Sequence, residues 1–441
     1  MRAVPPLAVA EAYLESLIDL EKERAPRRER LSLAPIRALL DRLGAPEHGL
    51  SVLHVAGSKG KGSTALFAEA VLRAAGARVG TFTSPHLERW TERFRVDGEE
   101  VAPERLAAAV EALRPHVDAL RGAGGETVPS FFDATTAAAL LLFRDLRVDH
   151  AVLEVGLGGR LDSTNAVEPA VCCITSIELE HTDLLGDTLA AIAAEKAGIL
   201  KPGVPAVCGE LPREALAVVE RRAADLGCPL ARLGREIELE VELAAADVTR
   251  LRYREGDFRF SAELRVPGAH QAANAALAVA AVRRLLAASR PADLAAAACA
   301  GLSAAQLPAR VEILARAPWI VVDAAHTGAS ARALAAVLHQ LARPVDFVMS
   351  VSAGKDTGAI LSALLPLARS LTLTRAESVR SQGPAEIAAV ARAVSPQVEL
   401  RFVPNPHLAL RAAREALAPD AVLCATGSVY LAGIARRVLR P

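Results

Sequence analysis

The sequence predicts an α/β protein with a larger N-terminal domain and a smaller C-terminal one. Its 441 residues are enough for two or three domains of ordinary size. Short runs of β-branched and aliphatic residues alternate with alanine- and leucine-rich helical stretches, which is typical of a mostly parallel sheet with crossover helices. This alternation restarts after Ala304–Pro308, a segment that predicts a linker. We therefore expect domains of residues 1–304 and 305–441.

The N-terminal domain is predicted to combine a mostly parallel sheet with a small antiparallel section. Its parallel strands are expected at 51–56, 78–82, 150–155 and 170–177. Polar and apolar residues alternate in the more polar section 237–266, as they do in antiparallel strands. Helices are expected at 7–23, 31–43, about 64–75 and from Gln271 onward.

The C-terminal domain is predicted to be a Rossmann-like α/β domain, because short apolar strands again alternate with helical stretches. The strands are expected at 320–322, 347–351, 371–374, 399–403 and 422–425.

Composition excludes several classes of protein. The 51 basic and 51 acidic residues cancel, which argues against nucleic acid or an anionic membrane as a partner. Glu11, Glu15 and Glu21 interrupt the first apolar stretch, so neither a secretory signal nor a transit peptide is predicted. No run reaches the roughly 18 apolar residues of a membrane-spanning helix. The six cysteines are scattered without a CxxC pair, as expected in the reducing cytoplasm.

The strongest local signal is HVAGSKGKGST, residues His54–Thr64, between a predicted strand and a predicted helix. Lys61 can reach the β- and γ-phosphates of a nucleotide, and the Ser63 hydroxyl can bind Mg²⁺. The loop is shorter than the standard Walker pattern, but the alternative of a glycine-rich turn with incidental lysines is less favoured. The segment predicts a P-loop-type ATPase domain. Three glycines let the backbone bend tightly and direct amides at an anion: Gly57, Gly60 and Gly62.

Polar residues at the carboxyl ends of three predicted strands suggest a metal site, since ligands of open α/β sheets bind there. These residues are Ser84, Glu154 and His181. Oxygen ligands suit Mg²⁺, whereas imidazole is an uncommon ligand for it. Each residue also has a structural alternative: a turn former before Pro85, a partner of Arg160, and a loop histidine. Their joint position beside a phosphate loop favours the metal site.

The chain resembles the folylpolyglutamate synthases and dihydrofolate synthases, relatives of the muramyl peptide ligases. The resemblance runs from about residue 35 to the C-terminus, and the blocks 154–165 and 175–203 are specific to this folate branch. It rests on motifs found in the family's order: GSKGKGST, SPHLERWTERFRVDG, SFFDATT, EVGLGGRLDSTN, TSIELEHTDLLG, EKAGILKPG, HQAAN, LPAR and DAAHT.

The resemblance implies an ATP-dependent ligase that adds L-glutamate to dihydropteroate, to folate polyglutamates, or to both. ATP would convert the acceptor carboxylate to an acyl phosphate, which the amine of glutamate attacks to give amide, ADP and phosphate. The implied partners are these small molecules, with Mg²⁺, in two ions, as cofactor. The family precedent is a monomer.

The resemblance also implies roles for individual residues. Lys196 matches a lysine that the family carbamylates, although the residues alone also allow a solvated pair with Glu195. His326 lies where the second domain meets the acyl phosphate and glutamate. Metal ligands would be Ser84, Glu154 and His181. The ATP site would comprise Lys59, Gly60, Lys61, Gly62, Ser63, Asn274, Arg310 and Asp323. The catalytic residues would be Lys61, Lys196, His326 and Asp323.

The pterin substrate would contact two segments, Ser130–Asp133 and Leu161–Ser163. The residues concerned are Ser130, Phe131, Phe132, Asp133, Leu161, Asp162 and Ser163. Phe131 and Phe132 could stack on a pterin, but adjacent aromatic residues are often core residues, so both interpretations stay open. Four positions depart from the commonest family pattern: Lys59 replaces an asparagine, Glu180 an aspartate, Ala309 a glycine and Thr327 an asparagine.

Other functions are weighed against this one. Muramyl peptide ligases carry a uridine-nucleotide domain ahead of the phosphate loop. Here only about fifty residues precede Gly57, which is too few for such a domain. A nucleotide-binding relative without ligase activity would be expected to lose residues such as Lys61 or Lys196, and these are present. A ligase with another carboxylate acceptor is the remaining alternative. We expect both folate activities, because SFFDATT and RLDSTN occur together.

Overall fold

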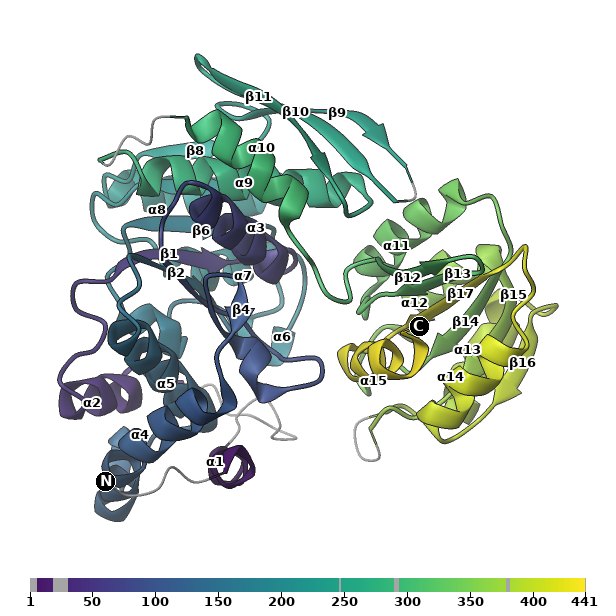
Figure 1. Cartoon of the computed structure of the whole chain (residues 1–441), viewed down its shortest axis with the longest axis horizontal. Helices are drawn as coiled ribbons and strands as arrows, with labels where there is room; N and C mark the ends of the chain where they lie inside the picture. Colours follow the sequence, from purple (N-terminus) through teal and green to yellow (C-terminus); the bar gives the residue numbers. More distant parts are fainter. Residues whose placement is uncertain (1–5, 19–30, 246, 289–292, 378–380, 441) are drawn as a thin grey trace. The chain divides into compact units, whose positions relative to one another are not determined.

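The computed structural model describes residues 6–18, 31–245, 247–288, 293–377 and 381–440. The chain divides into two compact units, each described here by itself (Figure 1). Unit 1 comprises Met1–Glu240, Arg252–Ala262 and Ala273–Ala305, and unit 2 comprises Val241–Leu251, Glu263–Ala272 and Gln306–Pro441. None of the helices in the described part of the chain is long and apolar enough to cross a membrane.

Unit 1 contains an eight-stranded sheet in the order β4-β3-β2-β5-β1-β6-β7-β8. Strands β2, β5, β1, β6, β7 and β8 pair in parallel, and β3 and β4 add an antiparallel edge. The predicted mostly parallel sheet is thereby confirmed. The strands are β1 Ser51–Ala56, β2 Val79–Phe82, β3 Phe94–Val96, β4 Glu99–Glu100, β5 His150–Glu154, β6 Val171–Ile174, β7 Ala206–Cys208 and β8 Leu230–Arg232.

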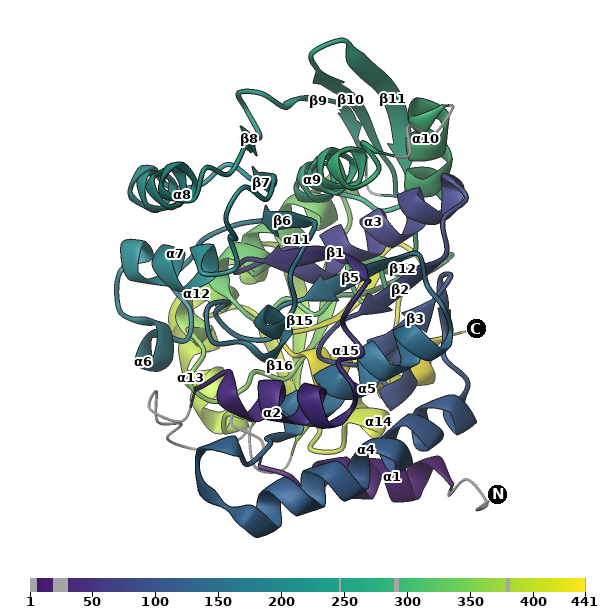
Figure 2. The same cartoon turned by 90° about the vertical axis from the view of Figure 1, so that its left-hand side faces the viewer.

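The helices of unit 1 pack against this sheet and against one another (Figure 2). Helix α4 packs against α1 and α5, α3 against α10, and α7 against α8. The expected helix 7–23 ends at Glu15, and its part beyond residue 18 lies outside the described residues. The helices are α1 Leu7–Glu15, α2 Ala34–Arg42, α3 Lys61–Ala74, α4 Pro103–Ala123, α5 Phe131–Asp145, α6 Thr182–Leu185, α7 Leu189–Ala197, α8 Arg213–Asp225, α9 Ala269–Leu285 and α10 Leu294–Ala304.

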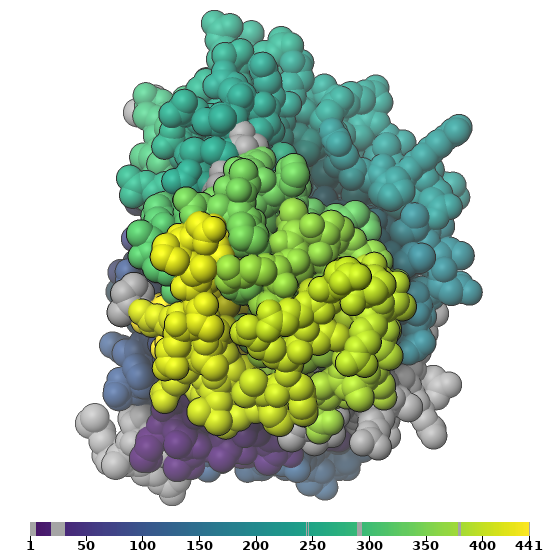
Figure 3. All heavy atoms as spheres, turned by 90° about the vertical axis from the view of Figure 1, so that its right-hand side faces the viewer, coloured from purple at the N-terminus to yellow at the C-terminus, as the bar shows by residue number. Residues whose placement is uncertain are grey.

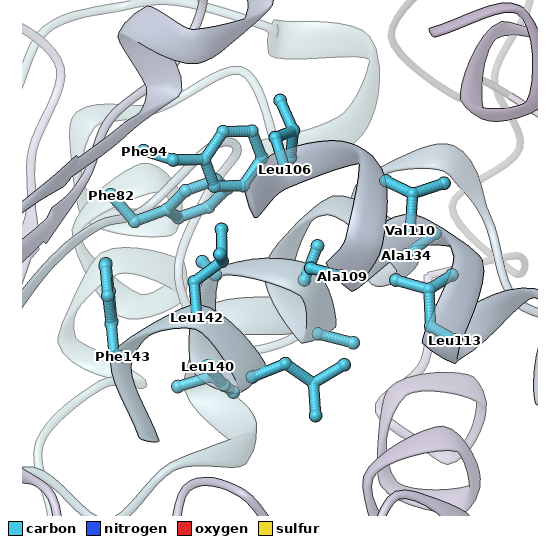
Figure 4. Packing of buried hydrophobic residues seen from close by; sticks show 14 of the residues in the cluster. Phe82, Phe94, Leu106, Ala109, Val110, Leu113, Ala134, Leu140, Leu142 and Phe143 are labelled. Atoms are coloured by element: carbon cyan, nitrogen blue, oxygen red, sulfur yellow. The ribbon is translucent and has the colours of Figure 1, made fainter. Parts of the chain in front are cut away.

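The core beside β2 shows why these residues form layers (Figure 4). Phe82 and Phe94 lie with ring centroids 5.6 Å apart and are fully buried with Phe143 of α5. A Cβ on Gly80 would lie 2.5 Å from Cδ1 of Phe143, so only glycine lets this ring lie on the strand. Each fully buried side chain of this size contributes about 1.5–3 kcal/mol. The core thereby fixes β2 and β5, whose carboxyl ends carry Ser84 and Glu154.

The polar section predicted to be antiparallel forms a separate three-stranded sheet in the order β11-β10-β9. Residues of β10 alternate between buried and exposed, as expected for a sheet with one covered face. Its strands are β9 Glu238–Ala244, β10 Thr249–Glu255 and β11 Phe258–Leu264.

Unit 2 contains a six-stranded sheet in the order β12-β13-β17-β14-β15-β16. All neighbours pair in parallel except β12, which is antiparallel to β13. Figure 3 shows one face of unit 2 in green and yellow, with the C-terminal segments in yellow. Its strands are β12 Glu312–Arg316, β13 Trp319–Val322, β14 Val345–Met349, β15 Ala368–Leu373, β16 Glu399–Phe402 and β17 Val422–Thr426; its helices are α11 Gly328–Gln340, α12 Thr357–Leu364, α13 Pro384–Val394, α14 Pro406–Glu415 and α15 Val429–Leu439.

Candidate functional site

The predicted phosphate loop joins β1 to α3 and is fastened to the segment that follows β6. The backbone N–H of Lys59 donates to Ser176 Oγ at 2.8 Å, and Thr175 Oγ1 donates to the Lys59 carbonyl at 2.6 Å. The N–H of Ser58 donates to the Ser176 carbonyl at 2.8 Å. Helix α3 begins at Lys61 rather than near residue 64, so Lys61 stands at the first helical position. The loop is therefore held rigidly at a helix N-terminus, the usual position for an anion.

Each glycine of the loop leaves room for a neighbouring polar side chain. A Cβ on Gly57 would lie 1.9 Å from Thr175 Oγ1, and one on Gly60, whose φ is +83°, would lie 2.3 Å from Asn274 Oδ1. At Gly62 the nearest atom would be Glu154 Oε2, at 3.3 Å. The structure thus brings two predicted residues, Asn274 of α9 and Glu154 of β5, against the loop.

Three lysines gather at this loop around one carbonyl oxygen and one carboxylate. Lys61 Nζ and Lys196 Nζ both donate to the carbonyl oxygen of Gly57, at 2.9 and 3.0 Å. Lys196 Nζ also donates to Glu180 Oε1 at 2.9 Å, and Glu180 Oε2 lies 3.5 Å from Lys59 Nζ. Glu180 therefore bridges Lys59 and Lys196.

The pKa values of this pair follow from burial and from the excess of positive charge. Burial, followed by the nearby Lys61 ammonium, lowers the pKa of Lys196 to about 8, against the effect of Glu180. Burial alone would raise the pKa of Glu180, but Lys196, Lys61 and Lys59 together lower it to about 2. At neutral pH the carboxylate is ionised, and Lys196 is unusually ready to lose its proton.

Two of the three predicted metal ligands lie together at the carboxyl ends of β2 and β5. The backbone N–H of Ser84 donates to Glu154 Oε2 at 3.0 Å, and Glu154 is 5% exposed. His181 is exposed, has φ of 47° and precedes α6. Within the described ranges, no group of three or more His, Cys, Asp or Glu side chains forms a metal site. The expected set contains a serine hydroxyl beside Glu154 and His181, and it stays a prediction.

The two segments predicted to contact the acceptor are joined by hydrogen bonds. Asp133 is 4% exposed; its Oδ1 accepts from Ser163 Oγ at 2.7 Å and its Oδ2 accepts from Ser130 Oγ at 2.6 Å. Burial raises the pKa of Asp133, against the effect of these hydrogen bonds. Asp162 caps the short helix Ser163–Ala166, and Leu161 directly precedes it in the chain.

The adjacent aromatic residues differ in their surroundings. Phe131 is buried, with its ring centroid 5.4 Å from that of Trp90, which favours the core interpretation for this residue. Phe132 is only partly buried; its ring lies 5.9 Å from that of Phe82 and directly over Gly156, where a Cβ would lie 2.6 Å from its Cζ. Phe132 is therefore the better candidate for contact with a planar ligand.

In unit 2, the Asp323 carboxylate holds the residue that follows Arg310 and the turn that follows Asp323 itself. Its Oδ2 accepts from Val311 N and its Oδ1 from Ala325 N, both at 2.7 Å. Burial raises the pKa of Asp323, whereas these amides and Arg310 lower it, and burial prevails. His326 Nδ1 lies 2.9 Å from the Ala324 carbonyl. Because a carbonyl only accepts, the neutral ring carries its proton on Nδ1, and Nε2 is its basic nitrogen.

Sequence reasoning gave no role to several residues that build this site. Thr175, Ser176 and Ser58 fasten the loop, and Glu180 had been noted only as a departure from a family pattern. The sequence does contain a signal for Glu180. Lys59 is a second lysine in the loop, and Glu180 has a longer side chain than the aspartate it replaces, so the two could form an ion pair. The contact itself requires the fold.

One cavity of about 270 Å³ lies in unit 2 at the start of β14, β15 and β16. Its charged side chains neutralise one another: Arg369 pairs with Asp346, and Arg401 with Glu399. It lies at the amino ends of the parallel strands, whereas ligands of such sheets bind at the carboxyl ends. We therefore expect the functional site elsewhere.

Family models match both parts of the chain. Residues 55–282 match the Mur ligase middle domain, and residues 311–438 match the C-terminal domain of dihydrofolate synthetase.

Individual proteins are similar over most of the chain. A Mycobacterium tuberculosis protein named dihydrofolate synthase/folylpolyglutamate synthase is 36% identical over 370 residues, covering 79% of this chain and 75% of that protein. A Haloferax volcanii protein, named a probable bifunctional folylpolyglutamate synthase/dihydropteroate synthase, is 36% identical over 410 residues; they cover 91% of this chain but 47% of that protein, so the chain spans about half its length. The structure of Mycobacterium tuberculosis folylpolyglutamate synthase complexed with ADP has a TM-score of 0.89 and 32% identity, covering 99% of this chain and 98% of that one.

Proposed function

The chain belongs to the folylpolyglutamate synthase and dihydrofolate synthase family of the Mur ligase superfamily, and from this premise we propose that it is an ATP-dependent glutamate ligase acting on both dihydropteroate and folates. The observation that carries the proposal is the pair of lysine ammoniums on the Gly57 carbonyl at a helix N-terminus. Residues 1–304 would bind ATP, and residues 305–441 would form the glutamate-ligase domain.

The proposed reaction has two steps. The acceptor carboxylate attacks the γ-phosphorus of ATP, and the bond to ADP breaks, giving an acyl phosphate. The amine of L-glutamate then attacks the acyl carbon, loses a proton, and inorganic phosphate leaves. Lys61 and the loop amides would stabilise the charge that moves onto ADP in the first step. Lys59, Gly60, Gly62, Ser63 and Asn274 would position the phosphates.

Residues of unit 2 are assigned to the same chemistry by their residue types. The Arg310 guanidinium is suited to bind phosphate oxygens, and Asp323 fixes its backbone. His326 Nε2 is the ring nitrogen that could accept a proton from the glutamate amine. These roles are proposals tested by substitution.

The residues present fit a magnesium ion. Glu154 offers a buried carboxylate beside Gly62 and the N–H of Ser84, and oxygen ligands are those that Mg²⁺ prefers. Ser84, Glu154 and His181 would hold it, and a bound ion would screen the charge of the phosphates. We propose two ions in all, the second near Lys196. Removal of Mg²⁺ by a chelator should abolish turnover.

Lys196 is proposed to be carbamylated. Lys196 is 1% exposed and its pKa is lowered to about 8, so the neutral amine that attacks CO₂ is available near neutral pH. The N–C bond forms, a proton is released, and the resulting anion would repel Glu180, so the pair at 2.9 Å must separate. Labelling with ¹³C-bicarbonate should give a carbamate signal that Lys196→Met lacks; its absence from the unchanged protein would exclude the modification.

Location and assembly are also proposed. The six cysteines are all free, which supports the cytoplasm, and we propose that the enzyme acts as a monomer, which sedimentation tests.

The deciding experiment measures ADP release with Mg²⁺, ATP and L-glutamate, using dihydropteroate, tetrahydrofolate or no acceptor. Turnover with both acceptors is expected. Turnover with one would assign the chain to that reaction alone. No turnover, in protein shown to bind ATP, would favour a different acceptor or an inactive relative.

A further inference from the structure

A buried histidine in β1 connects to the segment proposed to bind the acceptor. His54 is 0% exposed, and its Nε2 lies 2.8 Å from Thr164 Oγ1. Thr164 Oγ1 in turn donates to Asp162 Oδ1. Oδ1 also accepts from Thr164 N at 3.0 Å, and Oδ2 accepts from Leu157 N at 2.8 Å. The interactions form a continuous relay from the central strand to the short helix that begins at Ser163.

The direction of the relay follows from the chemistry of its members. An ionised carboxylate only accepts, so the single hydroxyl proton of Thr164 goes to Asp162. Thr164 Oγ1 must then accept from His54, which fixes the proton of the neutral ring on Nε2. Burial, with a smaller effect from Lys201, lowers the pKa of His54 to about 3, so the ring stays neutral at physiological pH and acts as a donor with one fixed tautomer.

Burying His54 with its proton on Nε2 costs free energy, and packing does not explain why a histidine stands here. With Nε2 as the donor, Nδ1 is a lone-pair acceptor, and among the described residues it has no hydrogen-bond partner. A buried polar atom without a partner destabilises a fold. An apolar side chain at this position of β1 would remove that cost, so the histidine points to a role other than stability.

The relay ends at Asp162, on one side of the proposed acceptor segment 161–163. A second hydrogen bond holds the other side of this segment. Ser163, the next residue after Asp162, donates to Asp133 at 2.7 Å. Asp162 and Ser163 are 6% and 7% exposed. The two residues are therefore held between His54, through Thr164, and Asp133, which lies in the other proposed acceptor segment.

We infer that His54 is a positioning residue for the acceptor: through Thr164 it fixes the turn that presents Asp162 and Ser163. The inference rests on the proposed function, which assigns residues 161–163 to the acceptor. It goes beyond that function in naming a residue that acts at a distance on one substrate only. The residues proposed to bind ATP and glutamate do not include this turn.

The test compares two replacements that differ in the donor. His54→Leu removes the donor and the orphaned Nδ1, whereas His54→Gln can place an amide N–H near the position of Nε2. We expect His54→Leu to raise KM for dihydropteroate about five-fold, the effect of one hydrogen bond, with kcat and KM for ATP unchanged. The melting temperature of His54→Leu should be equal to or above that of the parent, and His54→Gln should restore most of the KM. Equal effects on the KM values of ATP and acceptor, or no rescue by glutamine, would overturn the inference.

Thr164 provides a second route if His54→Leu does not fold. Thr164→Val removes the hydroxyl and should reproduce the rise in KM, while Thr164→Ser should not. The double variant His54→Leu/Thr164→Val should be no worse than either single variant, because both break one relay. Additive effects would show that the two residues act separately.

A readout without turnover separates this inference from the proposed function. Amide hydrogen exchange at residues 162–166 should be faster in His54→Leu than in the parent and His54→Gln, with exchange in the phosphate loop unchanged. Unchanged exchange at the turn would refute the relay even in an active enzyme. Absence of turnover in the parent protein would refute the proposed function and leave the exchange result to decide on the relay.

Discussion

Lys61 and Lys196 donate to the same carbonyl oxygen, that of Gly57, at 2.9 and 3.0 Å. Two ammonium groups so close repel one another, and Glu180 is the carboxylate that contacts one of them. Lys59 adds a third positive charge next to that carboxylate. The loop therefore carries an excess of positive charge before any ligand binds, which suits a polyphosphate.

Lys61→Ala should abolish turnover and leave the fold intact. Lys61 stands at the first helical position of α3, where its ammonium can reach phosphate oxygens, and preorganised charges of this kind are worth about 10²–10³-fold in kcat. The measurement is ADP release, with the melting temperature as the check on folding. Lys355→Ala, a lysine of unit 2 outside the loop, should be nearly as active as the parent. Retained activity in Lys61→Ala would mean that the loop does not serve phosphate transfer.

Gly60→Ala should weaken ATP binding through a steric effect on Asn274. The new Cβ would lie 2.3 Å from Asn274 Oδ1, in a residue with φ of +83°. The chain offers a matched control, because Gly76 has φ of +86° and nothing within 4 Å of its Cβ position. Both substitutions carry a similar backbone strain of about 1–2 kcal/mol.

The two glycine variants should therefore lose similar stability in chemical unfolding, and only Gly60→Ala should show a large rise in Kd for ATP, measured by calorimetry. Equal ATP affinity in both variants would show that the proximity of Gly60 to Asn274 is unimportant for the nucleotide.

The central strands could be predicted from the sequence because their residues are buried on both faces and form continuous apolar runs. Strands β1, β2, β5 and β6 were expected within a few residues of their observed limits. Short or peripheral strands gave no such signal. Strand β4 has two residues, Glu99 and Glu100, both polar, and β12 pairs only at the edge of its sheet. Their formation depends on a partner strand rather than on their own pattern.

The site residues also divide into those with a local sequence signal and those whose contacts depend on the fold. The glycine loop and Glu154 could be predicted to lie close together because both stand at the ends of predicted strands, whereas their roles stay predictions. The bridge formed by Glu180 between Lys59 and Lys196 joins segments that are distant in the sequence. Neither pattern nor propensity contains that contact, and the same holds for the relay from His54.

In protein whose Lys196 is not carbamylated, stability should respond to pH through this lysine. Burial and the Lys61 ammonium lower its pKa in the folded protein to about 8, from the usual 10.5, so its charged form costs free energy in the folded state. Below pH 8 the lysine is protonated in both states and the cost is complete. Between about pH 8 and 10.5 the folded protein loses the proton first, and stability rises by at most about 3 kcal/mol. Urea unfolding should give the parent a larger free energy of unfolding at pH 9.5 than at pH 7.5, and this increase should be smaller in Lys196→Met. The same increase in both proteins would contradict the prediction.

Asp323→Asn should destabilise unit 2 and lower activity together. The buried carboxylate accepts from Val311 N and Ala325 N, both at 2.7 Å. An asparagine has one acceptor oxygen, so its NH₂ would face one of these N–H groups, at a cost of about 1–3 kcal/mol. Asp356→Asn is a matched control: Asp356 caps α12 by accepting from Ala359 N at 2.9 Å, and asparagine caps a helix equally well. Thermal unfolding should therefore show a lower melting temperature for Asp323→Asn alone. If Asp323→Asn retained the parent's stability but lost turnover, the aspartate would act on the reaction directly rather than by holding Arg310.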